Sequence, residues 1–310
     1  MTQRHIPVLQ KEVLGVLQPA HGEVYVDLTA GFGGHASLVL DRLGPNGQAF
    51  LVDQDQTALE ALYDTFQADA RVHIHRANFA EVDWQSIPSP NMVLADLGVS
   101  SAQLDDAERG FSFQHDAPLD MRMDQNRGVS AADYLAQIEE EDLATIIWQY
   151  GEDKKSRQIA RAIVRARSMQ PITTTHQLAD IVRSQYPKGY HRIDPATRTF
   201  QALRIAVNRE LDALETMLDA ALAALAPGGR LAVISFHSLE DRIIKQKMRD
   251  ITRDICDTIT GQALQESQFR LVTKKPIIPA PNEIDYNPRA RSAKLRAVEK
   301  KKITQKKEVL

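Results

Sequence analysis

A glycine turn followed by an acid is the first feature of this sequence that could do chemistry. Gly31 and Gly33 follow an apolar run, and Asp53 ends the next apolar run. Glycines let a backbone approach a ligand closely, and an acid about twenty residues further on can grip a ribose diol. The turn and the acid predict an adenosine cofactor, although the spacing from Gly31 to Ala36 fits a dinucleotide fingerprint equally well. A nicotinamide cofactor therefore stays open as an alternative.

Two further features favour S-adenosylmethionine over a nicotinamide cofactor. Asp27 lies inside the apolar run directly before the glycine turn. Residues 225–231 have the pattern of a helix end, a Pro-Gly-Gly turn and an apolar strand, and this segment resembles the entry to the fifth strand of class I methyltransferases. An ordinary helix C-cap before a strand is the alternative explanation for the second feature.

The elements that position these residues alternate between strands and helices. Helical spacing begins near His35 and again at Thr57, and apolar runs between turns predict strands over residues 24–28, 49–52, 72–75 and 92–95. Such an order implies parallel strands joined by right-handed crossovers, with ligands bound at the carboxyl ends of the strands. Asp27, Asp53 and Asp96 all fall at such ends.

The later part of the chain predicts an insertion into this sheet. Residues 105–127 are polar and rich in turn residues, and residues 131–205 show only helical patterns. One long helix is expected over residues 203–226, and strands are expected over residues 231–236, 269–273 and 293–298. We expect an α/β fold with a doubly wound, mostly parallel seven-stranded sheet. Residues 1–105 and 201–310 form this discontinuous domain, and residues 106–200 form an all-helical insertion.

Composition excludes several classes of protein. Of the 310 residues, 43% are hydrophobic and 25% are charged, close to the average for globular proteins and unlike disordered or collagen-like chains. No apolar run approaches the length of a membrane span, and the residues after Met1 lack a secretory signal pattern. We therefore expect a cytoplasmic protein without a membrane partner. Cys256 is the only cysteine, so no internal disulfide or thiolate metal site is expected.

Positive charge is concentrated in two segments although the net charge of the chain is −3. Residues 153–210 hold twelve Lys or Arg against four Asp or Glu, and residues 274–310 hold eleven against four. Arginines recur every fourth residue at Arg157, Arg161 and Arg165, which predicts one stripe along a helix. The arginine stripe alone could be an ordinary solvent-exposed helix face. The two basic segments together favour a nucleic-acid partner. The lysines near the C-terminus are expected to form an RNA-binding tail.

Longer motifs carry a resemblance to one family. They run in the family's order from His5 to Arg296, and the chain resembles the bacterial 16S ribosomal RNA cytosine-N4 methyltransferase family. It departs at Phe32, where the family often has a polar residue, and over residues 250–268. The matching motifs are Thr29 to His35, Asp96 to Asp105, Glu108 to Phe113, Pro118 to Asp124, Pro195 to Ala202, Ser235 to Asp241 and Asn287 to Ser292.

The resemblance implies S-adenosylmethionine as cofactor and assigns residues to it. Gly33, Gly34 and His35 would line the methionine part, Asp53 the ribose, Phe79 the adenine, and Asp96 and Gln103 the inner pocket. The implied substrate is a cytidine in the decoding region of 16S ribosomal RNA, with the 30S subunit as the particle that is methylated. The oligomeric state stays open, a homodimer being one alternative.

Methylation of an exocyclic amine requires its lone pair to point at the sulfonium methyl. An acceptor hydrogen-bonded to the amine would take up the developing charge, and we expect Asp96 to do so, shared with Ser100 or Ser101. The Pro-Pro-aromatic segment of DNA amino-methyltransferases is absent after Asp96, so stacking of the target base is expected from another aromatic side chain. The candidates are Phe111, Phe113 and Phe236.

Arginines from both basic segments are the expected contacts to the RNA backbone. They are Arg157, Arg161 and Arg165 on the insertion, with Arg289 and Arg291 near the C-terminus. No metal is expected, since His73 and His75 alternate on a predicted strand and are assigned a structural role. Three other functions remain open: a nicotinamide-dependent oxidoreductase, a non-catalytic RNA-binding protein on a methyltransferase scaffold, and DNA cytosine methylation.

Overall fold

The computed structural model describes residues 7–257, 260 and 262–302. The chain divides into two compact units. The sheet unit comprises Met1–Gly98 and Ala213–Leu310, and the helical unit comprises Val99–Asp212. The boundaries expected from sequence, after residues 105 and 200, both fall inside the helical unit. Lys306 and Lys307 of the expected tail lie outside the described residues, as do the side chains of Ser101 and Cys256.

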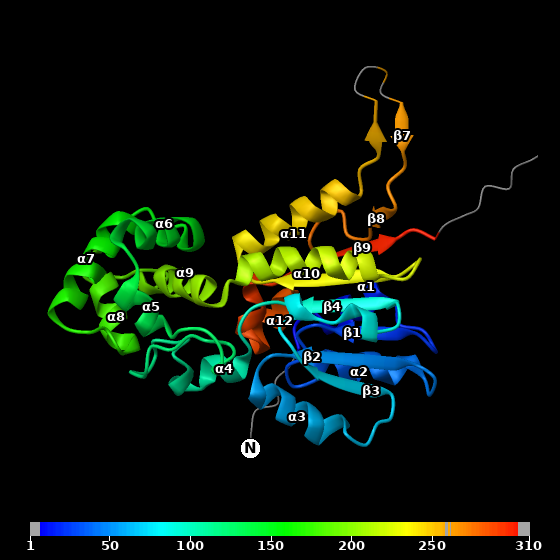
Figure 1. The fold of residues 1–310 in the computed structure, drawn as a ribbon, viewed down its shortest axis with the longest axis horizontal. Helices are drawn as coiled ribbons and strands as arrows, with labels where there is room; N and C mark the ends of the chain where they lie inside the picture. Colours follow the sequence, from blue (N-terminus) through cyan, green and yellow to red (C-terminus); the bar gives the residue numbers. More distant parts are fainter. Residues whose placement is uncertain (1–6, 258–259, 261, 303–310) are drawn as a thin grey trace, which may run out of the picture. The chain divides into compact units, whose positions relative to one another are not determined.

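Seven strands of the sheet unit form one sheet in the order β3-β2-β1-β4-β5-β9-β8 (Figure 1). The first five pair in parallel, and β9 is antiparallel to both of its neighbours. The predicted doubly wound, mostly parallel seven-stranded sheet is confirmed. The strands are β1 (Val24–Asp27), β2 (Gln48–Asp53), β3 (Val72–Arg76), β4 (Met92–Asp96), β5 (Arg230–Ser235), β8 (Phe269–Leu271) and β9 (Lys294–Lys300).

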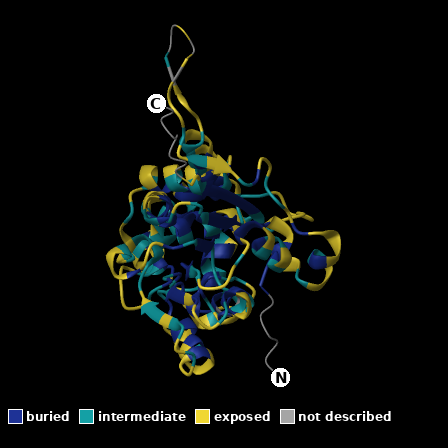
Figure 2. Ribbon diagram, turned by 90° about the vertical axis from the view of Figure 1, so that its right-hand side faces the viewer, coloured by how far each residue is buried: buried dark blue, intermediate teal, exposed yellow. Residues whose placement is uncertain are grey.

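Side chains alternate between two apolar layers along the central strands. Tyr25 points into the layer formed with α1 (Gln10–Leu17), α2 (Gly34–Leu43) and α3 (Gln56–Phe66). Val26, its neighbour on β1, points into the layer formed with α10 (Glu210–Ala224) and α11 (Ser238–Ile251). Both side chains are fully buried, as expected of a parallel sheet covered on both faces. Figure 2 shows the buried strands between more exposed helices.

The prediction of one long helix over residues 203–226 is wrong. The structure has two helices here, α9 (Ala196–Asn208) and α10, separated at Arg209. Arg209 has φ of 50°, the left-handed conformation that ends a helix. Helical periodicity missed this break because a single left-handed residue without Gly or Pro leaves the apolar pattern on either side intact.

The helical unit packs its helices around an apolar core of its own. Its helices before α9 are α4 (Ser101–Asp105), α5 (Ala131–Gln137), α6 (Glu140–Gly151), α7 (Ser156–Met169) and α8 (Thr175–Arg183). The predicted arginine stripe is confirmed on α7, where Arg157, Arg161 and Arg165 are exposed while Ile159 and Ile163 are fully buried. The core therefore fixes which face of α7 carries the arginines.

Several short elements complete the chain. A two-stranded hairpin that the sequence analysis did not predict pairs β6 (Ile255–Cys256) with β7 (Ala263–Gln265). The remaining elements are η1 (Phe79–Glu81), η2 (Trp84–Ser86), η3 (Ala107–Arg109), α12 (Pro281–Tyr286) and η4 (Pro288–Ser292). No helix in the described part of the chain combines the length and the apolar content needed to cross a bilayer.

Candidate active site

Asp27 lies at the carboxyl end of β1, where the sheet buries its carboxyl group. Only 1% of its surface is exposed. The hydroxyl of Tyr25 donates a hydrogen bond to Oδ2 over 2.8 Å, and the N–H of Thr29 donates to Oδ1 over 3.2 Å. Burial raises the pKa of Asp27 to about 7, and the charge of Asp53 acts in the same direction. The ordinary pKa of an aspartate is near 4, so Asp27 is poised to hold a proton near neutral pH.

Asp96 ends β4, a strand that pairs directly with β1. Its backbone N–H donates to the hydroxyl of Thr29 over 2.6 Å, which links the ends of the two strands. Its Oδ2 lies 3.8 Å from Nε2 of His35, and its buried Oδ1 has no hydrogen-bond partner among the described residues. Burial raises the pKa of Asp96 well above the ordinary range, with further contributions from Asp27 and Glu240.

Glu240 and His237 form a buried pair after β5, and the sequence analysis assigned neither of them a role. Glu240 accepts hydrogen bonds from the N–H groups of Phe236 over 2.8 Å and of His237 over 3.3 Å. The N–H of Glu240 in turn donates to Nδ1 of His237, which caps α11. The residue pattern His-x-x-Glu before a helix resembles a capping box and could have indicated the cap. Only the fold reveals that the Glu240 charge acts on Asp96.

The glycine turn and Asp53 are held together by backbone donors. Gly31 donates to Oδ2 of Asp53 over 2.9 Å, and Asp55 donates to Oδ1 over the same distance. A Cβ on Gly33 would lie 2.4 Å from the Phe66 ring, so this glycine is required for packing of the turn. A Cβ on Gly31, which has φ of 52°, would meet only the carbonyl oxygen of Thr29, at an ordinary contact distance of 3.9 Å. Gly31 is therefore the glycine of this turn whose backbone a ligand can approach.

Gly34 and His35 open α2, directly after the turn. A Cβ on Gly34 would lie 2.3 Å from Cγ of Pro7, so the missing side chain of Gly34 makes room for Pro7. His35 is 93% buried in the first turn of the helix and faces Asp96. Phe79 begins η1 and lies half-buried against the apolar layer that contains Phe50.

Ser100 and Gln103 belong to the helical unit. The N–H of Ser100 donates to Oε1 of Gln103 over 3.0 Å, and the N–H of Gln103 donates to the Ser100 hydroxyl over 3.2 Å. This reciprocal pair fixes the start of α4. Within the sheet unit the structure brings Asp27, His35 and Asp96 together.

Acceptor groups of the sheet unit fit a ligand that carries hydrogen-bond donors. Oδ1 of Asp96 is a buried acceptor that no described group satisfies, and such an atom is costly unless a ligand donates to it. Both oxygens of Asp53 accept backbone N–H groups, and a carboxylate has about four acceptor sites, so Asp53 can accept a hydroxyl as well. A nucleoside with a ribose diol matches this donor and acceptor set.

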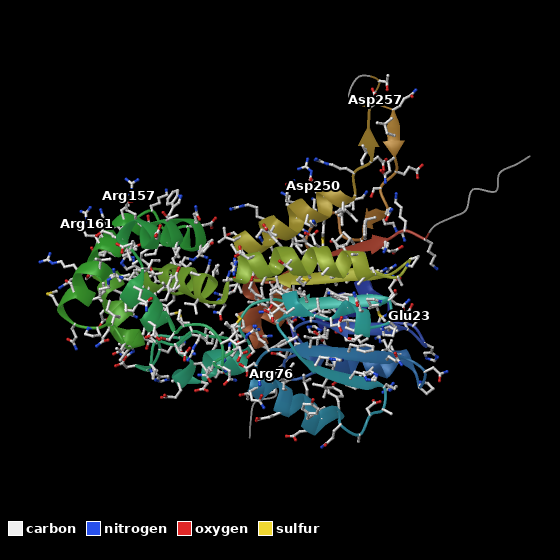
Figure 3. All side chains as sticks on the ribbon, in the orientation of Figure 1. Glu23, Arg76, Arg157, Arg161, Asp250 and Asp257 are labelled. Atoms are coloured by element: carbon white, nitrogen blue, oxygen red, sulfur yellow. The ribbon has the colours of Figure 1, made fainter. Side chains whose placement is uncertain are left out.

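The predicted RNA-contact arginines are all on the surface. Arg157, Arg161 and Arg165 are exposed on α7, and Figure 3 shows the first two pointing away from the neighbouring helices. Nε of Arg161 lies 3.6 Å from a carboxylate oxygen of Glu140, a pair too exposed to hold the side chain firmly. Arg289 and Arg291 are exposed on η4 of the sheet unit.

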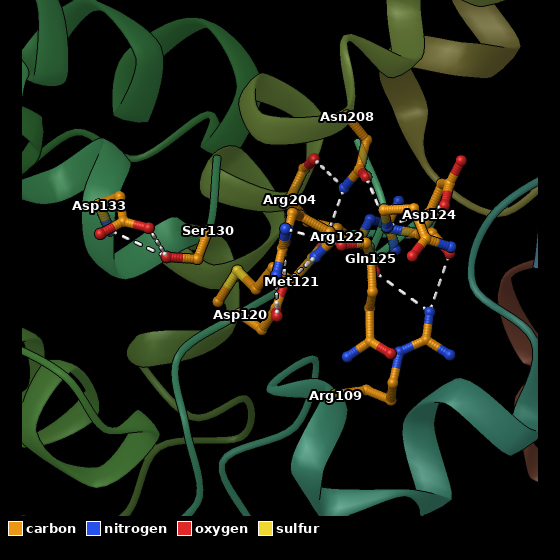
Figure 4. A network of polar contacts seen from close by, with 12 residues as sticks. Arg109, Asp120, Met121, Arg122, Asp124, Gln125, Ser130, Asp133, Arg204 and Asn208 are labelled. Atoms are coloured by element: carbon orange, nitrogen blue, oxygen red, sulfur yellow. Dashed lines mark hydrogen bonds and ion pairs between the residues drawn. The ribbon is translucent and has the colours of Figure 1, made fainter. Parts of the chain in front are cut away.

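A polar network in the helical unit fixes the segment that contains residues 118–124 (Figure 4). Asn208 at the end of α9 donates to the carbonyl of Met121 and accepts from the N–H of Met123, both over 2.8 Å. Met121 has φ of 63° with its side chain fully buried. Arg122 forms two hydrogen bonds to Asp120, of 2.7 and 2.8 Å. The segment is recognisable as a motif in the sequence, but its anchor Asn208 becomes evident only in the structure.

Comparison with known proteins decides the family. The model of the MraW methylase family matches residues 2–301. The chain belongs to the MraW methylase family. It is 50% identical over 309 residues to ribosomal RNA small subunit methyltransferase H of Xanthomonas oryzae pv. oryzae strain PXO99A, a match that covers 96% of this chain and 88% of the relative. The protein of the same name from Stenotrophomonas maltophilia is 47% identical over 303 residues, covering 96% and 93%.

Among solved structures, a putative rRNA-methylase from Clostridium thermocellum aligns with 96% of this chain and 100% of that one, with a TM-score of 0.45 and 12% identity. The family resemblance predicted from the motifs is confirmed by the family model and by the curated relatives. The protein is therefore a methyltransferase, and its methyl donor is S-adenosylmethionine, as predicted.

Proposed function

We propose that this methyltransferase transfers a methyl group to the exocyclic N4 of a cytidine in the decoding region of 16S ribosomal RNA. The names of its curated relatives, ribosomal RNA small subunit methyltransferase H, support a substrate in small-subunit ribosomal RNA. The observation that supports this chemistry is the position of Asp96. It places a buried acceptor without a described partner beside the glycine turn, where the N–H of an amine can be received.

The sheet unit holds the cofactor in this proposal. Bound S-adenosylmethionine supplies an electrophilic methyl group on a sulfonium sulfur. Asp53 receives the ribose hydroxyls, and the half-buried ring of Phe79 offers an apolar face to adenine. The start of α2 lies beside the methionine part, where backbone N–H groups of the first helical turn favour a carboxylate. Gly33, Gly34 and His35 complete the proposed cofactor contacts of the sheet unit, and the contact of Gln103 stays a prediction from the family resemblance.

Asp96 acts on the amine that receives the methyl group. A new N–C bond forms as the methyl–sulfur bond breaks, and the nitrogen then sheds one of its protons. Asp96 accepts a hydrogen bond from the amine through Oδ1 and takes up that proton, and a catalytic role for Ser100 stays a prediction from the sequence. Burial raises the pKa of Asp96, which makes its carboxylate a stronger proton acceptor.

RNA contacts position the target base. The base must leave its stack, which costs a few kcal/mol and is easiest where the RNA is unpaired. Phosphate contacts offset that cost, and the exposed arginines of α7, with Arg289 and Arg291 on η4, provide them in this proposal. The helical unit, expected from sequence as residues 106–200, then serves as the RNA-recognition domain, and the 30S subunit is the substrate.

Transfer of labelled methyl groups tests the proposal. The wild-type chain is incubated with labelled S-adenosylmethionine and with 30S subunits that lack the modification, naked 16S RNA or DNA, and the nucleosides are identified by mass analysis. N4-methylcytidine from decoding-region RNA is the expected product. Methylation of another atom or only of DNA would overturn the proposed substrate, and cofactor binding without transfer to any substrate would overturn the proposed reaction.

A further inference from the structure

An exposed basic loop joins α8 to α9 in the helical unit. It spans residues 187–193 and contains no acidic residue. Tyr190 at its centre is 93% exposed and Ile193 is 63% exposed. Lys188, His191 and Arg192 are exposed as well. The loop therefore presents an aromatic ring between two permanent positive charges.

The first end of the loop is anchored by Tyr186. Its hydroxyl donates to Oδ2 of Asp153 over 2.5 Å, and burial together with this hydrogen bond raises the pKa of Tyr186, so that the hydroxyl stays a donor. The ammonium group of Lys155 lies 4.5 Å from the centre of the Tyr186 ring and donates to the carbonyl of Gln185. The ring of His191 packs edge-on against Tyr186 at 6.0 Å.

The second end of the loop is anchored by Asp194. Its Oδ2 accepts from Nε and from the terminal nitrogen of Arg183 over 3.0 and 2.9 Å, and its Oδ1 accepts from the N–H of Ala196 over 2.8 Å. The guanidinium of Arg183 also lies 5.4 Å from the centre of the Phe113 ring. Both ends of the loop are therefore anchored to the helical unit.

The position of the loop connects it to the basic stripe of α7. Lys155, which contacts Tyr186, is the N-cap residue of α7, and Arg157 is the second residue of that helix. Proteins that bind unpaired nucleic acid combine positive side chains along the backbone with aromatic rings on which bases stack. The anchored loop and the stripe contain both components within one compact unit.

We propose that Tyr190 stacks on an unpaired base of the RNA substrate while Lys188 and Arg192 contact the phosphates on either side of it. The inference deepens the proposed function, on which the identity of the RNA rests. Tyr63 is the matched comparison, because it is 52% exposed on α3 but lies among the acidic residues Glu60 and Asp64. The negative charges of Glu60 and Asp64 repel the phosphates of RNA, so Tyr63 is not expected to bind RNA.

Binding of a short single-stranded oligouridine, measured by fluorescence anisotropy with the full chain, tests the stacking role. We expect Tyr190→Ala and Tyr190→Leu to weaken binding about tenfold and Tyr190→Phe to leave it within about twofold, because stacking needs a ring rather than an apolar side chain. Affinity for a duplex RNA of equal length should stay unchanged in all three variants. Tyr63→Ala should leave both affinities unchanged, and equal oligouridine affinity of Tyr190→Ala and wild type would overturn the inference.

The flanking charges are tested by salt dependence. The double variant Lys188→Gln/Arg192→Gln should bind oligouridine more weakly, and the slope of log affinity against log salt should fall by about 0.7 for each phosphate contact removed. An unchanged slope would reject the phosphate contacts. All the loop positions are exposed, so unchanged melting temperatures are expected and confirm that the variants are folded.

Methyl transfer by the wild-type chain to 30S subunits, measured in parallel, separates the two proposals. Methyl transfer by the wild-type chain together with unchanged oligouridine binding by Tyr190→Ala would overturn the stacking role and support the proposed function. Absence of methyl transfer together with weakened oligouridine binding by Tyr190→Ala would overturn the proposed function and keep the stacking role.

Discussion

Charged side chains differ in solvent exposure between the carboxyl ends of the strands and the surface of the helical unit. At the sheet edge Asp27 is buried and Asp96 is partly buried, and burial raises the pKa of both carboxyl groups. On the helical unit the arginines of α7 and the cations of the loop at residues 187–193 are exposed to water. Acids whose pKa is raised are stronger proton acceptors when ionised, whereas exposed cations suit contact with a phosphate backbone.

The two tasks should therefore be separable by substitution. A change at the sheet edge should alter the chemical step or cofactor binding and leave RNA affinity alone. A change on α7 should alter RNA affinity and leave the chemical step alone. Each prediction below tests one side of that separation, beginning with the largest expected effect.

Replacing Asp96 should have the largest effect on turnover. Asp96→Asn keeps the shape of the side chain but removes the acceptor for the proton of the amine. We expect the single-turnover rate of methyl transfer to fall about 10²-fold to 10⁴-fold, with RNA affinity within about twofold of wild type. Asp64→Asn, an exposed acid on α3, is the control. Full turnover by Asp96→Asn would exclude the proposed role of Asp96.

The raised pKa of Asp27 should make stability depend on pH. An acid whose pKa is about 7 in the folded chain and near 4 in the unfolded chain binds its proton more tightly when folded. Its stabilising contribution is therefore complete below pH 4 and is lost as the pH rises through 7.

Between these pH values the free energy of unfolding of the wild-type chain should fall relative to that of Asp27→Asn. The upper bound is about 4 kcal/mol, from 1.36 kcal/mol per pKa unit. Denaturant unfolding of both chains across this pH range measures the difference. Parallel curves for the two proteins would show that Asp27 does not titrate there.

Charge reversal on α7 should weaken RNA binding about tenfold to a hundredfold. The variant is Arg157→Glu/Arg161→Glu/Arg165→Glu, and the salt dependence of binding should become shallower because fewer phosphates are neutralised. Affinity for S-adenosylmethionine should not change. A matched variant that reverses three exposed charges elsewhere, such as Lys11, Arg42 and Arg76 of the sheet unit, controls for net charge. Equal losses in both variants would remove the special role of α7.

Replacing Asp53 should weaken cofactor binding about tenfold, the smallest of these effects. Asp53→Ala removes the acceptor proposed for the ribose hydroxyls, and a lost hydrogen bond to a charged group costs about 1.5 to 3 kcal/mol. Calorimetric titration with S-adenosylmethionine measures the affinity, and RNA affinity should remain unchanged. Because Asp53 also accepts from Gly31 and Asp55, the melting temperature is recorded for the same variant. Unchanged cofactor affinity would reject the ribose contact.

The strands were predictable because their apolar runs end in turns. The expected ends of β1 to β4 lie within one residue of those in the structure, since a buried parallel strand leaves a continuous apolar run. The end of α9 was not predictable, because Arg209 adopts a left-handed conformation without being Gly or Asn. Propensity alone does not indicate such a residue.

The site was predictable only where residues follow strands directly. Asp27, Asp53 and Asp96 were found in this way, since parallel strands bring their ends to one edge. Glu240 lies on a helix distant in sequence from Asp96, and its effect on the Asp96 pKa arises from folding alone. Tyr190 was missed because a single aromatic residue in a polar loop has no pattern until its exposure is known.

The most direct test of the separation between chemistry and RNA binding is the rate of methyl transfer at increasing concentrations of RNA substrate. The α7 charge-reversal variant should reach the wild-type rate once RNA is saturating, whereas Asp96→Asn should stay slow at every concentration. A charge-reversal variant that remains slow at saturation, or an Asp96→Asn variant that recovers, would contradict the account.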